Sequence, residues 1–162
     1  MSSFRTLFRK VGVFCLACGR GYNVAMIKTN LLFLLKPKAD LVYLFDDCTL
    51  RQAMEKMKAH RYSVVPVINH EGKYVRTISE GDLLAYFIDN KLDFEQSDNI
   101  KLSDVPSYRS YKLGEISAEP KDILDIIMGQ NFVPLADDTG TFIGIVTRQS
   151  VMKAFIKDLE EQ

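Results

Sequence analysis

The second half of this chain repeats the first, and that repeat limits its fold more than any other feature of the sequence. The run Val-Pro-Val at 65–67 returns 68 positions later as Val-Pro-Leu at 133–135, and Gly72 returns as Gly140. Only 5 of the 25 positions from 64 to 88 are identical in the second copy, yet apolar positions recur in step along the segment. Two copies of one small unit favour packing around a pseudo-two-fold axis, with two related clefts.

Each copy has the same predicted order of elements: strand, helix, strand, strand and helix. The first helix begins with a capping box formed by Thr49 and Gln52, and its Leu50, Ala53, Met54 and Met57 share one face that is expected to be core. In the first copy, strands are expected at 40–45, 64–68 and 74–78, followed by a helix capped by Ser79. In the second copy, strands are expected at 114–117, 132–136 and 142–146, with one helix whose first turn contains Pro120 and a final helix capped by Thr147.

The predicted fold is therefore of the α/β (α+β) class, with two pseudo-symmetric βαββα repeats packed sheet to sheet. Each unit alone would leave one face of a small sheet exposed, and pairing two units buries it. An apolar helical segment should precede the first repeat and end near Leu35, because Pro37 disfavours helix just before it. The predicted parts are an extension over 1–25, the helical segment over 26–36, a first repeat over 37–90, a polar linker over 91–110 with one short helix around 102–105, and a second repeat over 111–160.

Residues 1–25 belong to neither repeat and are expected to be a disordered or non-native extension, with translation from Met26 as one explanation. Their basic start and short apolar run follow the order of a signal peptide, but no small-residue cleavage site follows the run. Cys15 and Cys18 form a lone C-x-x-C pair, with no second pair to complete a metal site. The three cysteines of the chain form no even set, which suits a reducing, cytoplasmic compartment.

Composition and motifs argue against several classes of function. Lys+Arg 21 balances Asp+Glu 21, so no basic field would attract nucleic acid or an anionic membrane. No stretch approaches the roughly 18 apolar residues of a membrane span. The chain has no P-loop and no glycine-rich dinucleotide motif, and His60 and His70 have no catalytic partner at motif spacing. We therefore expect no enzyme activity.

Two local motifs carry a family resemblance. The second copy ends in the run Gly-Ile-Val-Thr-Arg-Gln-Ser at 144–150, and the first copy has Arg-Thr-Ile-Ser-Glu-Gly-Asp at 76–82. In both copies a Val-Pro strand follows the first helix. In this order the motifs resemble the cystathionine-β-synthase (CBS) domain, and the chain resembles a stand-alone CBS pair, or Bateman-type module, over about 36–159. Arg76 departs from the pattern, since the family usually has glycine there.

The resemblance implies that adenosine-containing ligands bind in clefts between the two repeats. A hydroxyl at a helix N-terminus, as at Ser79 and Thr147, lies beside free backbone N–H groups and suits a phosphate. Asp82 is able to accept from both hydroxyls of a ribose, whereas Ser150 at the equivalent place makes no charge-assisted contact, so the two clefts should be unequal. The alternative is that Ser79 and Asp82 form only a structural capping box.

Further candidate residues follow from the family pattern. The residues before the proline of each copy, 62–64 and 131–133, would supply backbone groups and apolar walls for adenine. Lys36, Lys38 and Arg148 would face phosphates, with the alternative that the two lysines only end the apolar helix favourably. The candidate ligand-binding residues are Lys36, Lys38, Tyr62, Ser63, Val64, Pro66, Ser79, Asp82, Asn131, Phe132, Pro134, Thr147, Arg148 and Ser150.

Two functions remain open on this basis. The first is a cytoplasmic adenine-nucleotide sensor that forms a homodimer and changes its affinity for a regulated partner protein when it binds AMP, ATP or cyclic di-AMP, with no obligatory cofactor and no metal. The resemblance makes cyclic di-AMP a candidate because some stand-alone CBS pairs of this size bind it. The second is a ligand-free dimerisation or scaffold module, which Arg76 and Ser150 favour. Under the first function, Asp82→Ala should remove nucleotide binding and leave the fold intact.

Overall fold

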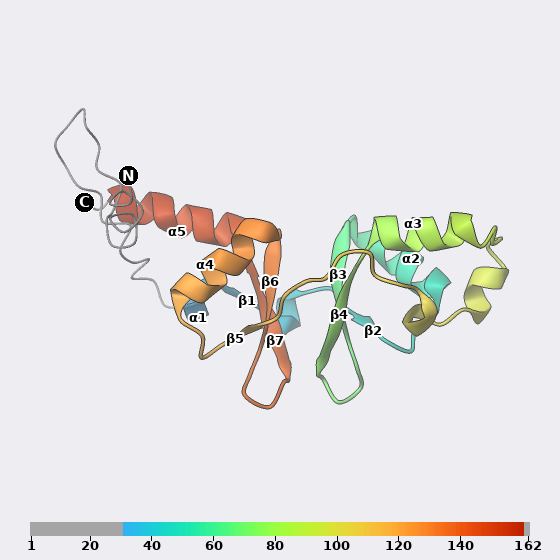
Figure 1. Ribbon diagram of the computed structural model, residues 1–162, viewed down its shortest axis with the longest axis horizontal. Helices are drawn as coiled ribbons and strands as arrows, with labels where there is room; N and C mark the ends of the chain where they lie inside the picture. Colours follow the sequence, from blue (N-terminus) through green and yellow to red (C-terminus); the bar gives the residue numbers. More distant parts are fainter. Residues whose placement is uncertain (1–30, 161–162) are drawn as a thin grey trace, which may run out of the picture.

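The computed structural model describes residues 31–160. The predicted extension over 1–25, with Cys15 and Cys18, lies outside this range, as does the first part of the predicted helical segment. Two sheets face each other at the centre of the molecule, and helices flank each sheet on its outer side (Figure 1). Within residues 31–160, no helix combines the length and the apolar character needed to cross a membrane.

The first repeat forms a three-stranded sheet in the order β2-β3-β4. Strand β2 (Leu44–Phe45) runs parallel to β3 (Val64–Ile68), which pairs antiparallel with β4 (Tyr74–Ser79). Helix α2 (Leu50–His60) joins β2 to β3, and α3 (Glu80–Asp89) follows β4. The predicted Thr49 capping box is present. The strand expected over 40–45 is confined to β2, because a short 3-10 helix, η2 (Lys38–Asp40), occupies its start.

The second repeat has the same elements within a four-stranded sheet, in the order β1-β7-β6-β5. Its elements are β5 (Gly114–Glu115), α4 (Pro120–Gly129), β6 (Phe132–Ala136), β7 (Phe142–Thr147) and α5 (Arg148–Glu160). Strand β5 runs parallel to β6, and β6 pairs antiparallel with β7, as β2, β3 and β4 do in the first repeat. The predicted βαββα unit therefore occurs twice.

Residues that lie 68 positions apart meet where the two repeats touch. Lys73 and Thr141 form an antiparallel bridge, and the ring centroids of Tyr74 and Phe142 lie 6.2 Å apart. The Phe142 N–H also donates to the Gly72 carbonyl at 2.9 Å. Because residues contact their own counterparts, this contact lies on the pseudo-two-fold axis that the repeat predicts.

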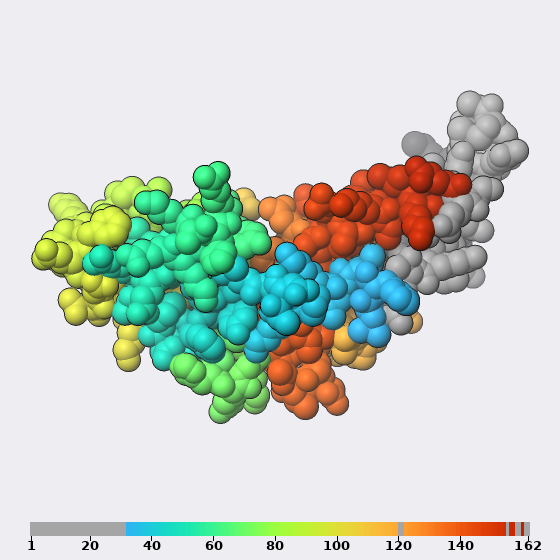
Figure 2. Space-filling view, turned by 180° about the vertical axis from the view of Figure 1, so that it is seen from behind, coloured from blue at the N-terminus to red at the C-terminus, as the bar shows by residue number. Residues whose placement is uncertain are grey.

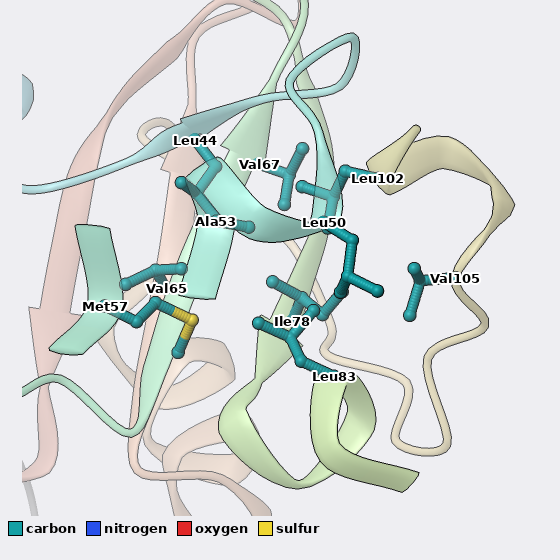
Figure 3. Packing of buried hydrophobic residues seen from close by; sticks show 10 residues of the cluster. All are labelled: Leu44, Leu50, Ala53, Met57, Val65, Val67, Ile78, Leu83, Leu102 and Val105. Carbon is teal, nitrogen blue, oxygen red and sulfur yellow. The ribbon is translucent and has the colours of Figure 1, made fainter. Parts of the chain in front are cut away.

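Each repeat has its own core, and a third cluster joins them. The core of the first repeat lies between α2, α3 and the sheet (Figure 3). The joining cluster contains Ile68 from β3 with Phe132, Phe142 and Ile145 from β6 and β7. The apolar faces of both sheets are therefore buried against each other, which confirms the predicted sheet-to-sheet packing.

The N-terminal segment crosses to the second repeat, which differs from the helix predicted over 26–36. Of its described residues, Leu31–Leu34 form helix α1, and β1 (Leu35–Pro37) pairs antiparallel with β7. Gly144 permits this pairing, since a Cβ at that position would lie 2.2 Å from the Lys36 carbonyl oxygen. Leu34 then packs into the second core. The pre-proline restriction ends the helix, and the absence of a side chain at 144 admits the strand.

The linker stays with the first repeat and completes its core. Its two short helices are η3 (Gln96–Asn99) and η4 (Leu102–Asp104), the latter at the place predicted. Leu102 and Val105 are fully buried in the first core (Figure 3). The guanidinium of Arg76 donates to the carbonyls of both residues. Arg76 departs from the family pattern at the position equivalent to Gly144. Its side chain binds the linker, whereas Gly144 in the second repeat leaves room for β1.

Candidate functional site

Ser79 caps helix α3 at the place where the sequence predicts the first phosphate site. Its Oγ accepts from the Asp82 N–H at 3.1 Å, and its own N–H donates to Asp82 Oδ2 at 2.8 Å. These two bonds form the predicted capping box. The other N–H groups of the first turn add partial positive charge at this end of the helix.

The carboxylate of Asp82 is buried, and both of its oxygens are bonded within the protein. Besides the Ser79 N–H, Oδ2 accepts from the Ser79 hydroxyl at 2.8 Å, and Oδ1 accepts from the Tyr108 N–H at 3.1 Å. Only 5% of Asp82 is exposed. The segment 105–108, which we call the linker strap, therefore lies across the N-terminus of α3. A ribose that bonded to Oδ1 would have to replace the Tyr108 N–H.

The second repeat has an equivalent cap without a carboxylate. The Ser150 N–H donates to Thr147 Oγ1 at 3.0 Å, and the Ser150 hydroxyl donates to the Thr147 carbonyl at 2.8 Å. The two predicted clefts therefore differ in charge at their helix ends, since one has a buried carboxylate and the other a hydroxyl.

The two segments expected to contact adenine lie beside these caps. The Ser63 carbonyl accepts from the Glu80 N–H, and the Asn131 carbonyl accepts from the Arg148 N–H, each at 2.9 Å. Backbone pairing thus brings each segment next to its hydroxyl residue. Of the candidate residues in and beside these segments, the exposed ones are Tyr62, Ser63 and Asn131, the half-buried one is Val64, and the buried ones are Pro66, Phe132 and Pro134.

The side chain of Arg148 has a partner that sequence reasoning missed. Its Nε donates to the Ile127 carbonyl at 3.2 Å, and one terminal nitrogen donates to the Gln130 carbonyl at 2.9 Å. These carbonyls belong to the C-terminal end of α4, where helices carry partial negative charge. Arg148 therefore stabilises the end of α4 in this structure, and a phosphate would compete with that role.

Lys36 and Lys38 have different surroundings. Lys36 is exposed on β1, whereas Lys38 lines a pocket of about 550 Å³ between the chain that follows β1 and helix α2. Tyr43, Lys56 and His60 line the same pocket, which we call the Tyr43 pocket. Sequence reasoning missed Lys56 and treated His60 as an ordinary surface residue. Their spacing of four was the available signal, because it places them on one face of α2.

His70, which has no catalytic partner at motif spacing, pairs with a carboxylate brought to it by β2. Its Nε2 lies 2.8 Å from Asp47 Oδ2, and its ring stacks on Phe45 at a centroid distance of 4.7 Å. The hydrogen bond and the charge of Asp47 raise the pKa of His70 above its usual value. The same hydrogen bond lowers the pKa of Asp47. Both side chains are exposed, so we interpret the pair as a surface ion pair of the turn rather than a catalytic dyad.

We expect an NMR titration to give His70 a pKa above 6.5 and Asp47→Asn to return it toward that value. Asp46→Asn is the matched control and should lower the pKa less, because Asp46 contributes only a small Coulomb attraction. Since folding raises the pKa of His70, its contribution to stability is present below pH 6.5 and is lost as the pH rises through the folded value. An equal effect of the two substitutions on the pKa of His70 would contradict its pairing with Asp47.

The described residues offer little for metal or nucleophilic chemistry. Within residues 31–160, no group of three or more His, Cys, Asp or Glu side chains is placed to hold a metal ion. Burial raises the pKa of the Cys48 thiol to about 11. The thiol is therefore protonated near pH 7, and the thiolate that would act as a nucleophile is scarce.

Comparisons with known proteins agree with this arrangement. The family model for the CBS domain matches residues 35–89 and 116–157. The crystal structure of CbpB in complex with c-di-AMP is 28% identical, with a TM-score of 0.75, and the match covers 82% of this chain and 88% of that one. CbpB from Streptococcus agalactiae is also 28% identical, with a TM-score of 0.75, over 88% of this chain and 92% of that one.

A third relative is similar over a small part of its length. The A-adding tRNA nucleotidyltransferase of Aquifex aeolicus is 31% identical over 118 residues, which is 70% of this chain. This chain spans only 13% of that enzyme, so the similarity concerns one region of a much longer protein.

Proposed function

Because this chain belongs to the CBS-domain family, we propose that it is a regulatory module that binds an adenine nucleotide, with cyclic di-AMP as the first ligand to test. The similarity to CbpB in complex with c-di-AMP carries the proposal. Two hydroxyl-capped helix N-termini, at Ser79 and Thr147, support it because such helix ends bind phosphate groups. AMP and ATP are the alternatives, and the proposed role is cytoplasmic and regulatory rather than catalytic.

The linker strap supplies a route from ligand to partner. A ribose at Asp82 would take the place of the Tyr108 N–H on Oδ1, and the strap would leave the N-terminus of α3. The strap is also held by the Ser107 hydroxyl, which donates to the Thr77 carbonyl at 3.3 Å. A partner protein that contacts the strap would then distinguish the free from the liganded state, as a switch requires.

The test is a thermal shift of the full chain, backed by calorimetry, with cyclic di-AMP, AMP, ATP and cyclic di-GMP as a control with a different base. A ligand at a hundred times its Kd adds about 2.7 kcal/mol, which raises Tm by roughly 5–10 °C. Ser79→Ala should weaken binding about tenfold through the lost phosphate contact. Thr49→Ala, which removes the cap of α2, is the control for stability loss alone. No response to any adenine nucleotide would overturn the proposal.

A ligand-free scaffold is the second candidate function. It is favoured by one observation, namely that both oxygens of Asp82 and the guanidinium of Arg148 already have partners within the protein. A scaffold would show no change in Tm with nucleotides and would keep its oligomeric state in all of them. The same titration therefore separates the two functions.

The homodimer that we propose uses the exposed apolar side chains of α3 and α5. Leu84 and Ile88 on α3 are 55% and 61% exposed, and their counterparts Met152 and Ile156 on α5 are 53% and 51% exposed. Both helices run along the same side of the molecule (Figure 1). Because the pseudo-two-fold axis relates the two pairs, they form a surface that a second copy is able to match.

We expect Ile88→Glu to convert a dimer to a monomer in sedimentation equilibrium, because it places a charge in the apolar contact. Met128→Glu is the matched control, since Met128 is 82% exposed on α4 and is not one of the apolar side chains of α3 and α5 that form this surface. A wild-type monomer, or a dimer that withstands Ile88→Glu, would exclude this surface.

A further inference from the structure

The side chain of Arg76 holds the linker beside the candidate site at the N-terminus of α3, which we call the first site. One terminal nitrogen donates to the Val105 carbonyl and also to the Ser107 hydroxyl oxygen at 3.3 Å, and the other donates to the Leu102 carbonyl. In the part of the chain that the structure describes, all hydrogen bonds of this side chain go to the linker. Burial lowers the pKa of the Arg76 guanidinium. A half-buried cation needs these acceptors because it has lost part of its hydration.

The linker has a buried part and an exposed part, which meet in the strap. Leu102 and Val105 are fully buried in the first core (Figure 3). Pro106 and Tyr108 are exposed, and Ser107 between them is half-buried. Figure 2 shows the first part of the linker, in yellow, at the end of the molecule farthest from the second repeat, and the strap begins the return toward β5. The exposed part of the strap can therefore leave α3 while the buried part stays in the core.

Ser107 joins Arg76 to the backbone of β4. Its hydroxyl oxygen accepts from the Arg76 guanidinium, and the same hydroxyl donates to the Thr77 carbonyl, each at 3.3 Å. The next residue, Tyr108, donates its N–H to Asp82 Oδ1 at 3.1 Å. A strap that is held at Ser107 therefore keeps this N–H on the carboxylate oxygen that a ribose would use.

The equivalent site of the second repeat, which we call the second site, lacks this contact. Its counterpart of Arg76 is Gly144, which has no side chain, and β1 pairs with β7 at that place. Its counterpart of Asp82 is Ser150, whose N–H and hydroxyl both bond to Thr147. Among the described residues, Ser150 therefore holds no segment of the linker, and only the first site has to open before its cap is free.

We propose that Arg76 and Ser107 form a latch that holds the strap on Asp82 and thereby lowers the nucleotide affinity of the first site. This inference rests on the proposed function and deepens it, because it names the residues that regulate binding at one of the two sites. The apparent affinity of a site is its intrinsic affinity multiplied by the fraction of molecules in which the site is open. A weaker latch raises that fraction, so removal of the latch should tighten binding. A contact that only stabilised the fold would have no such effect.

The test is an NMR titration of the full chain with cyclic di-AMP, in which the amides of Ser79 and Thr147 report the two sites separately. Ser107→Ala removes both hydroxyl contacts and should raise the affinity of the first site about tenfold, the weight of one hydrogen bond to a charged group, with no change at the second site. Ser103→Ala is the matched control, because its exposed hydroxyl on η4 donates to Asp104 and not to the latch.

A second variant tests the other half of the latch. Arg76→Met keeps a long side chain without donors and should also tighten binding at the first site, whereas Arg76→Lys should lie between this variant and the wild type. In the free protein, the Tyr108 amide should exchange faster in Ser107→Ala than in Ser103→Ala, because its strap is open more often. Thermal unfolding of each variant establishes that it folds.

Each outcome decides the inference. An affinity of the first site that is unchanged or lower in Ser107→Ala would overturn the latch and leave the proposed function in place, and so would an equal rise at both sites. If the wild type binds only at the second site, binding at the first site in Ser107→Ala would support the latch, and its absence would refute it. No binding of cyclic di-AMP, AMP or ATP to the wild type or to either latch variant would overturn the inference together with the proposed function.

Discussion

Gly144→Ala should lower the free energy of unfolding by about 3 kcal/mol and Tm by roughly 6–12 °C. The added Cβ would lie 2.2 Å from the Lys36 carbonyl oxygen and 2.9 Å from Leu35 Cδ1. The nearer atom belongs to the backbone of β1, so it moves only if the pairing between β1 and β7 loosens. Leu34, which precedes β1, would then leave the second core.

Urea and thermal unfolding measure the loss, and hydrogen exchange locates it. The amides of β1 and β7, which pair Lys36 with Ile145, should lose protection before those of β3 and β4. Gly129→Ala is the control, since a Cβ there meets nothing within 4 Å and the residue ends helix α4. A Tm within about 2 °C of wild type for Gly144→Ala would mean that β1 is not needed for the second sheet.

Local patterns in the sequence predict the repeated unit well. Strands β3 and β6 begin and end where predicted, because each is a short apolar run bounded by polar residues. The capping boxes at Thr49 and Ser79 also form as predicted, since both partners lie within four residues. The crossing of β1 could not be predicted in this way. It depends on Gly144, more than a hundred residues away, and no periodicity within the segment reports that distant pairing.

In the candidate site, too, local features could be predicted from the sequence and long-range contacts could not. Ser79 and Thr147 lie at helix N-termini as predicted, because a hydroxyl cap is a local feature. The contact of Asp82 with the linker strap depends on a residue 26 positions away, and the partners of Arg148 belong to the end of another helix. Long-range contacts such as these decide whether a charged side chain is free for a ligand, and sequence spacing does not contain them.

Asp82→Ala should lower the free energy of unfolding by about 3 kcal/mol, a loss of stability that the sequence alone does not predict. Three donors lose their acceptor together: the N–H and hydroxyl of Ser79 and the N–H of Tyr108. Hydrogen bonds to a charged group contribute more than those between neutral groups, and the loss of a cap adds about 1 kcal/mol. Chemical unfolding at constant pH measures the sum.

Hydrogen exchange at the Tyr108 amide distinguishes the strap from the cap. Asp82→Ala should remove its protection, whereas Ser150→Ala, the equivalent substitution in the second repeat, should leave it unchanged and cost about 1 kcal/mol. Protection that survives in Asp82→Ala would exclude a strap held by this carboxylate. If a nucleotide bonds to Asp82, it should also release the Tyr108 amide in the wild type while it raises Tm. In the variant, the Tyr108 amide should be released together with a loss of stability, and in the complex it should be released together with a gain of stability. These two results would identify Asp82 as the group that couples the ligand to the linker.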